Sequence, residues 1–184
     1  MSSIERQDRQ ITLAELSVAV VLVALLAAMS IPSFLELRLS ARVSEATTNL
    51  AALTTAEEAY FVEYQMYVGR GIQSPSGAAT PDTRPWPSTA PDFDTLGFSP
   101  EGDVYFVYAA TVAGTAYSLG ARGDLDGRGE PSDFGYIKID PRGNDAGDPF
   151  GGGCVGGVFD PENPDRPLPG TVGPCGQHDG GNDF

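Results

Sequence analysis

The sequence predicts an α+β protein in which a long N-terminal helix packs on a small antiparallel β-sheet head, with a disulfide-bounded C-terminal loop region after the sheet. Three observations support this prediction. Residues 11–31 are apolar almost throughout, residues 33–68 carry apolar side chains at helical spacing, and residues 103–140 contain three runs rich in β-branched and aromatic residues. The chain has 184 residues, enough for one ordinary domain.

The first apolar segment has the length of a membrane span. Residues 1–10 are polar, and residues 11–31 contain one charged side chain, Glu15. A helix over residues 11–31 is about 31 Å long, close to the thickness of a bilayer's hydrocarbon core. Because soluble helices of this length are not apolar on every face, we expect the segment to span a membrane. The competing interpretation is a secretory signal cut near Ser30, although its leader lacks net positive charge and its apolar run is long.

The acidic side chain of Glu15 inside this apolar segment is expected to have a function. An ionisable group at the centre of a spanning helix costs about 2.5–3.5 kcal/mol, and less near the end, so Glu15 is expected to have a positive partner. A plain membrane anchor does not explain it. The run from Gln10 to Leu16, followed by a long apolar helix with Pro32 near its end, resembles the N-terminus of type IV pilins and pseudopilins.

The resemblance implies how the N-terminus is processed. In this family a prepilin peptidase removes a polar leader, here residues 1–10, by cutting before an apolar residue, here between Gln10 and Ile11. The new α-amine is then methylated. Glu15 becomes the fifth residue after the cut, and the resemblance implies that it pairs with the Ile11 amine of a neighbouring subunit. The residue before the cut is normally Gly, Ala or Ser, so Gln10 is expected to slow or block cleavage. Pro32 is expected to kink or loosen the helix.

Residues 32–184 are predicted to form the extracytoplasmic head. Apolar residues recur every three or four positions through Tyr64, which predicts an amphipathic helix over about residues 33–68, ended by Gly69 and Gly71. Glu57 stands where the apolar stripe expects another apolar side chain.

The remainder of the head follows from turn and strand signals. Six prolines in residues 69–100 predict a loop, which Trp86 is expected to pin to the head. Residues 103–140 predict an antiparallel β-meander, one face of which would cover the helix. The Gly/Pro-rich tail, residues 141–184, has no periodic pattern and cannot build a core of its own.

The tail contains the only two cysteines, Cys154 and Cys175. Twenty residues separate them, whereas metal-binding pairs are usually two to four residues apart and need further ligands, and the chain has one histidine. We interpret the pair as a disulfide, which implies an oxidising compartment. Two unpaired thiols are the alternative.

A possible calcium site lies between the second and third predicted strands. Asp124 and Asp126 alternate, and Gly129 follows, as in a calcium-binding loop. Arg128 and Gly135 stand where oxygen ligands are expected, so a solvated turn whose side chains cap their own backbone is the competing interpretation. Calcium is the only cofactor that the sequence suggests.

Charge and motifs argue against two classes of function. With 11 Lys and Arg against 25 Asp and Glu, the net charge is −14, so we expect no nucleic acid as partner. No nucleophile–base pattern, phosphate-binding loop or metal cluster is recognisable, so we do not expect an enzyme.

Two functions remain. The resemblance implies a structural subunit of a type IV pilus or related filament, assembled through the N-terminal helix and serving adhesion, motility or secretion. Its partners would be other pilins, the prepilin peptidase and the inner-membrane assembly machinery. It would lie in the inner membrane before assembly and then in a surface pilus or periplasmic pseudopilus. Major pilin, minor pilin and pseudopilin are not distinguished. The alternative is a membrane-anchored periplasmic binding module that does not polymerise.

Overall fold

The structure, a computed structural model, describes residues 12–129, 131–151, 158–160 and 163–175. It has the predicted α+β composition, with one long N-terminal helix and antiparallel sheets. The chain divides into two compact units, Met1–Arg38 and Leu39–Phe184. The second unit is the head and contains every strand of the described chain.

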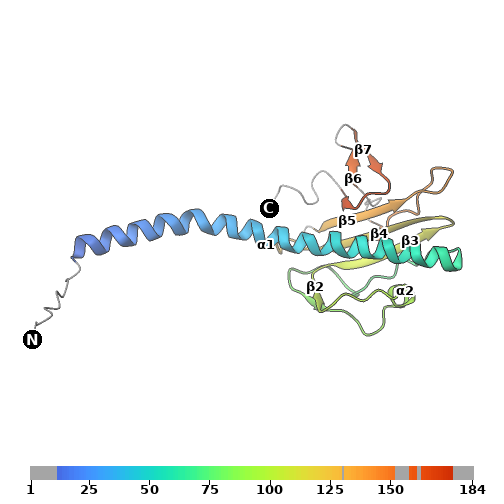
Figure 1. Cartoon of the computed structure of the whole chain (residues 1–184), viewed down its shortest axis with the longest axis horizontal. Helices are drawn as coiled ribbons and strands as arrows, with labels where there is room; N and C mark the ends of the chain where they lie inside the picture. Colours follow the sequence, from blue (N-terminus) through green and yellow to red (C-terminus); the bar gives the residue numbers. More distant parts are fainter. Residues whose placement is uncertain (1–11, 130, 152–157, 161–162, 176–184) are drawn as a thin grey trace, which may run out of the picture. The chain divides into compact units, whose positions relative to one another are not determined.

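The first element, α1 (Leu13–Tyr64), is a single helix of 52 residues (Figure 1). It combines the two helical segments that the sequence predicted. The secondary structure runs through position 32, so the expected kink or loosening at Pro32 does not interrupt the helix. A proline removes only one backbone donor, and the hydrogen bonds of neighbouring residues maintain the helix on either side.

None of the helices in the described part of the chain has the length and apolar character that a membrane crossing requires. This differs from the prediction for residues 11–31, of which Ile11 and the side chains of residues 29–31 lie outside the described part.

The C-terminal end of α1 differs from the prediction. The helix ends at Tyr64, before the predicted boundary at residue 68, because Gln65 adopts a left-handed conformation with φ 57°. Its backbone N–H donates to the carbonyl oxygen of Phe61 at 2.8 Å, and its side-chain amide donates to the same oxygen at 3.0 Å. These bonds satisfy the last turn of the helix.

Gly69 therefore has a role other than ending the helix. It passes so close to the edge of the sheet that an added Cβ would lie 2.7 Å from the carbonyl carbon of Ala110. Gly71 donates to the Ala110 carbonyl at 2.8 Å, and Ser74 exchanges two backbone hydrogen bonds with Tyr108. The segment after α1 is thereby held against the first strand of the main sheet.

The main sheet contains the predicted meander and one unpredicted strand. Its order is β3-β4-β5-β8, with every neighbouring pair antiparallel. The strands are β3 (Val107–Ala113), β4 (Ala116–Gly123), β5 (Ser132–Lys138) and β8 (Gly173–Pro174). Strand β8 belongs to the Gly/Pro-rich tail. The tail has no periodic apolar pattern, but its backbone still forms hydrogen bonds with β5.

Smaller elements surround the sheet. The first predicted strand run is divided, because β2 (Asp103–Val104) pairs with β1 (Arg84–Pro85) instead of continuing into β3. A short helix, α2 (Pro91–Thr95), lies in the proline-rich region. In the tail, β6 (Val158–Asp160) pairs with β7 (Asn163–Leu168), a hairpin that the sequence did not predict.

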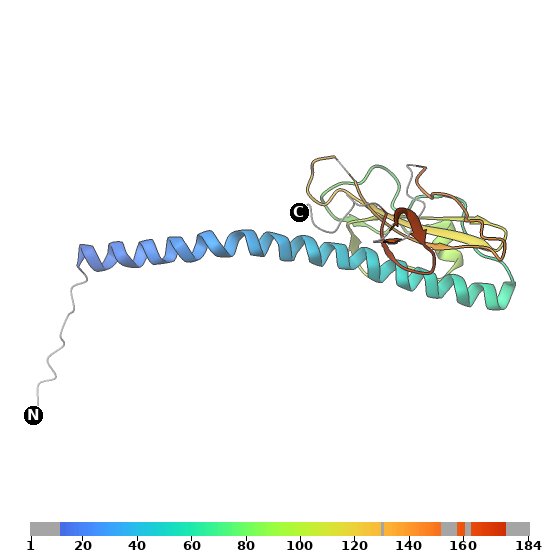
Figure 2. The ribbon, with the colours of Figure 1, turned by 90° about the horizontal axis from the view of Figure 1, so that it is seen from above.

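The core of the head lies between α1 and the sheet. Figures 1 and 2 show the C-terminal part of α1 running along one face of β3, β4 and β5. Ala46, Leu50 and Leu53, from the predicted apolar stripe, are fully buried there together with Tyr108 and Tyr117 of the sheet. A sheet face thus covers the helix stripe, as predicted.

Trp86 anchors the proline-rich loop, as its position in the sequence suggested. Its ring centroid lies 5.5 Å from that of Phe93, 5.8 Å from that of Phe98 and 6.1 Å from that of Tyr108. Aromatic pairs at such separations stabilise packing beyond the area they bury.

Candidate functional site

The N-terminal end of α1 is closed by a capping box. The backbone N–H and the hydroxyl of Thr12 each donate to Oε2 of Glu15 at 2.9 Å, and the N–H of Glu15 donates to the Thr12 hydroxyl oxygen at 3.3 Å. The pattern Thr-x-x-Glu satisfies two backbone donors that a helix start leaves free. Glu15 therefore has a local structural role that the sequence prediction did not include.

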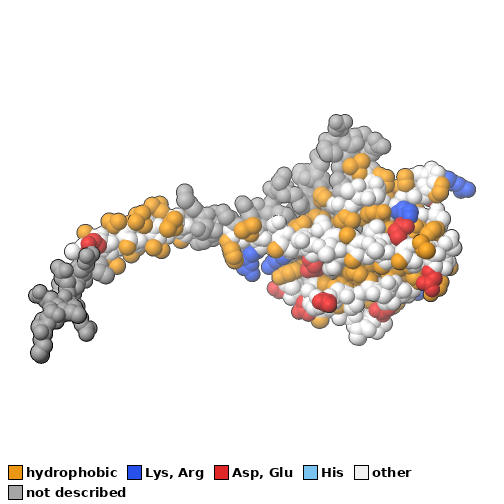
Figure 3. All heavy atoms as spheres, in the orientation of Figure 1, with side chains coloured by type: hydrophobic (Ala, Val, Ile, Leu, Met, Phe, Trp, Pro, Cys, Tyr) orange, Lys and Arg blue, Asp and Glu red, His pale blue; other side chains and the backbone are white. Residues whose placement is uncertain are grey.

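The N-terminal part of α1 exposes apolar side chains, drawn in orange on the face that Figure 3 shows. Every described side chain from residue 12 to residue 28 is exposed. Exposed fractions reach 87% for Leu13, 66% for Val23 and 66% for Leu26. Because apolar surface in water costs about 25 cal/mol per Å², such a helix is stable in contact with lipid or with other protein.

Several of the predicted site residues lie outside the described residues. These include Gln10 and Ile11, at the predicted cut, and Cys154. Cys175 is 4% exposed, is not a free thiol, and donates its N–H to the carbonyl oxygen of Asp133 at 2.9 Å. The Cys154–Cys175 pairing stays a prediction.

The comparisons with known proteins gave one significant similarity. Over 67 residues the chain is 39% identical to the type IV major pilin protein PilA of Myxococcus xanthus. The match covers 36% of this chain and 30% of that protein, so the alignment spans less than a third of the pilin's length. No family model and no solved structure matches the chain. The similarity agrees with the resemblance on which the N-terminal prediction rests.

The Asp/Gly turn holds its carboxylates by local contacts. Asp124 Oδ1 accepts from the N–H of Gly127 at 2.9 Å, and Asp126 Oδ1 accepts from the N–H of Arg128 at 3.0 Å. The Arg128 Nε atom lies 3.2 Å from Oδ2 of Asp126. Within the described ranges, no three His, Cys, Asp or Glu side chains are grouped to hold a metal ion. Glu130 lies outside those ranges, and calcium binding at Asp124 and Asp126 stays a prediction.

A pocket of about 380 Å³ borders the same turn. Its walls include Asp124, Arg122 and Phe150. The Arg122 guanidinium lies 4.6 Å from the Phe150 ring centroid and donates from Nε to Asp133 Oδ1 at 2.8 Å. A cation held in this way is largely neutralised, so the pocket does not offer an isolated charge to a ligand.

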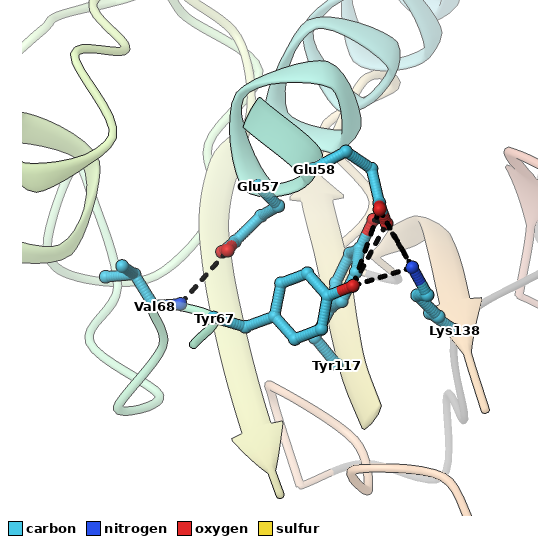
Figure 4. A network of polar contacts seen from close by, with 6 residues as sticks. All are labelled: Glu57, Glu58, Tyr67, Val68, Tyr117 and Lys138. Atoms are coloured by element: carbon cyan, nitrogen blue, oxygen red, sulfur yellow. Dashed lines mark hydrogen bonds and ion pairs between the residues drawn. The ribbon is translucent and has the colours of Figure 1, made fainter. Parts of the chain in front are cut away.

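A polar cluster on the helix side of the sheet joins α1 to β5 (Figure 4). Lys138, the only lysine of the chain, donates from Nζ to the two carboxylate oxygens of Glu58 at 2.6 and 2.8 Å and to the Tyr67 hydroxyl at 2.6 Å. The Tyr117 hydroxyl donates to Glu58 at 3.1 Å. Burial tends to lower the pKa of Lys138, but its bonds to Glu58 and Tyr67 outweigh this and raise it.

Glu57, the neighbour of Glu58, points the other way and is fully buried. Burial raises its pKa to about 7, partly offset by a hydrogen bond from the N–H of Val68 to Oε2 at 3.0 Å. The sequence prediction did not identify this group or the Lys138 cluster. The detectable signals were the acid inside the apolar stripe and the single lysine.

Proposed function

We propose that this chain is a structural subunit of a type IV pilus or a related filament, and that it assembles through the N-terminal part of α1. The observation that carries the proposal is the exposed, all-round apolar surface of residues 13–28. Such a surface suits a segment surrounded first by lipid and then by the same segment of neighbouring subunits. The partial similarity to a type IV major pilin supports the same function.

The proposed route to the filament begins in the inner membrane. The prepilin peptidase cuts between Gln10 and Ile11, the new amine is methylated, and the assembly machinery moves the subunit into a surface pilus or periplasmic pseudopilus. The filament then serves adhesion, motility or secretion. An acidic head of this kind contributes no attraction to anionic lipid headgroups, so the apolar helix supplies the membrane attachment.

Glu15 is proposed to pair with the Ile11 amine of a neighbouring subunit during assembly. A carboxylate offers about four acceptor positions on its two oxygens. Glu15 Oε2 accepts from Thr12 within the same chain, which leaves acceptor capacity for an incoming ammonium group. Charge-assisted bonds of this type are stronger than neutral ones, particularly away from water.

The test separates the charge of Glu15 from its capping role. Glutamine also serves in a capping box, so Glu15→Gln preserves the helix start while removing the charge. Glu15→Ala removes both, and Glu63→Ala, at an exposed glutamate near the other end of α1, is the matched control. The full chain is produced with a prepilin peptidase and pilus assembly machinery, and sheared filaments are quantified against the membrane pool.

We expect Glu15→Gln and Glu15→Ala to reduce the filament fraction by roughly an order of magnitude or more, as loss of a charge-assisted bond away from water predicts, while Glu63→Ala assembles normally. Filaments of the parent chain should start at Ile11. Normal assembly of Glu15→Gln would show that the charge of Glu15 is not needed for assembly and that the residue acts only in the helix cap. Membrane-bound parent protein that keeps Met1 and forms no filament would overturn the proposed function.

A further inference from the structure

The buried carboxyl group of Glu57 sits at the junction between α1 and the segment that follows it, residues 65–75. One of its oxygens, Oε2, accepts from the Val68 N–H at 3.0 Å. The other, Oε1, is buried and has no hydrogen-bond partner among the residues that the structure describes. The side chain as a whole is 0% exposed.

The charges around Glu57 make an ionised carboxylate more costly still. The described charged groups that act on it are Asp92 of α2 and Glu58 of α1, and both are acidic. Arg70 and Lys138 are each paired with another acid. Arg70 Nε lies 3.8 Å from Asp92 Oδ1, and Lys138 Nζ lies 2.6 Å from Glu58 Oε1. A buried carboxylate without a counter-ion and with an unsatisfied oxygen is destabilising.

We propose that Glu57 is a proton-dependent latch, which holds residues 65–75 on α1 when its carboxyl group is protonated and loosens that segment when it ionises. Ionisation requires water at Oε1, and water reaches this atom if the segment moves away from α1. The segment has other contacts as well. The Tyr67 ring stacks on that of Phe61 at 4.5 Å, and the Tyr67 hydroxyl accepts from Lys138 at 2.6 Å. The Arg70 N–H donates to Asp92 at 2.8 Å, and Gly71 and Ser74 form backbone bonds with β3. The Glu57–Val68 bond is the contact among these that depends on the proton of Glu57.

The direction of the pH effect follows from where the proton binds. Burial raises the pKa of Glu57 from 4.5 to about 7, so the closed form binds the proton more tightly than the open form. The stabilisation is complete below about pH 4.5 and is lost as the pH rises to about 7. Between about pH 5 and pH 8, the opening equilibrium constant should increase by a factor on the order of 10².

Hydrogen–deuterium exchange of the full-length chain in detergent micelles tests the proposal. Exchange of residues 65–75 is followed from about pH 5 to pH 8 and corrected for the intrinsic rate at each pH. Glu57→Gln replaces the titrating group by a neutral one of similar shape. The matched control is Glu45→Gln. Glu45 is a partly buried acid of α1 that accepts from the Tyr105 N–H and the Tyr108 hydroxyl and does not bind the segment.

We expect the parent chain and Glu45→Gln to lose protection in residues 65–75 as the pH rises, and Glu57→Gln to change by less than about threefold, since no titrating group remains there. The same pH dependence in Glu57→Gln, or none in the parent, overturns the latch. If Glu57→Gln does not fold, ¹³C-carboxyl titration of glutamate-labelled parent protein decides. The latch requires one glutamate that titrates above about pH 6, and it fails without one. Neither measurement depends on filament assembly.

Discussion

Replacing Lys138 by methionine should destabilise the head while leaving its apolar packing in place. Methionine preserves an unbranched apolar side chain of similar length. It removes the Nζ atom, which lies 5.1 Å from the Tyr67 ring centroid and 5.9 Å from those of Tyr117 and Phe61. Glu58 then retains a bond from Tyr117 at 3.1 Å but has no cation.

The expected loss in the free energy of unfolding of Lys138→Met follows from the contacts that the substitution removes. The Lys138 and Glu58 side chains are 34% and 42% exposed, so solvent screens the pair and its contribution is about 1 kcal/mol at most. The Tyr67 hydrogen bond and the cation–π contacts add about 0.5–1 kcal/mol each. These terms overlap, and we expect a loss of about 2 kcal/mol in the free energy of unfolding. With a slope of about 2 kcal/mol per M, the urea midpoint falls by about 1 M.

Urea unfolding of the parent, Lys138→Met, Glu58→Gln and the double variant measures this prediction. A coupling energy of about 1 kcal/mol between the two positions is expected. Arg142→Met is the control, because Arg142 is an exposed cation in the turn after β5 and its removal changes the net charge equally. Equal midpoints for Lys138→Met and Arg142→Met would show that the cluster contributes nothing beyond net charge.

Three further predictions concern the residues singled out in the sequence. Gln10→Gly should raise the cleaved fraction when a prepilin peptidase is present, and equally fast, complete cleavage of the parent would contradict this. Mass measurement after alkylation, with and without reduction, should reveal two protected thiols, Cys154 and Cys175, and alkylation of both in the native protein would rule out the bridge. For calcium we expect no shift of the melting temperature, because Arg128 already pairs with Asp126. A weak rise that saturates at roughly 10⁻⁴–10⁻³ M and is lost in Asp126→Asn would establish a site. No shift at several times that concentration would leave Arg128 as the counter-ion of the turn.

Local patterns in the sequence were sufficient for the main elements. The stripe that contains Leu50 and Leu53 predicted the face of α1 that the sheet covers, and the β-branched and aromatic runs predicted the meander. Both predictions rest on side-chain periodicity along a few turns or one strand, which the chain displays without reference to distant residues. The Thr12–Glu15 capping box was equally local, but the interpretation of Glu15 as an assembly residue left it unnoticed.

The sequence by itself therefore determined the long helix, its apolar face and the antiparallel strands. Only the tertiary structure decided what the charged groups of the head do. Glu58 pairs with Lys138, which lies 80 residues later in the sequence. Glu57 is buried by the segment that folds back onto α1 after Gln65. From the sequence pattern alone, the side chain of an acidic residue in the apolar stripe, such as Glu57, could be either exposed or buried. Burial and pairing depend on which distant surface covers the residue, and local periodicity carries no information about that surface.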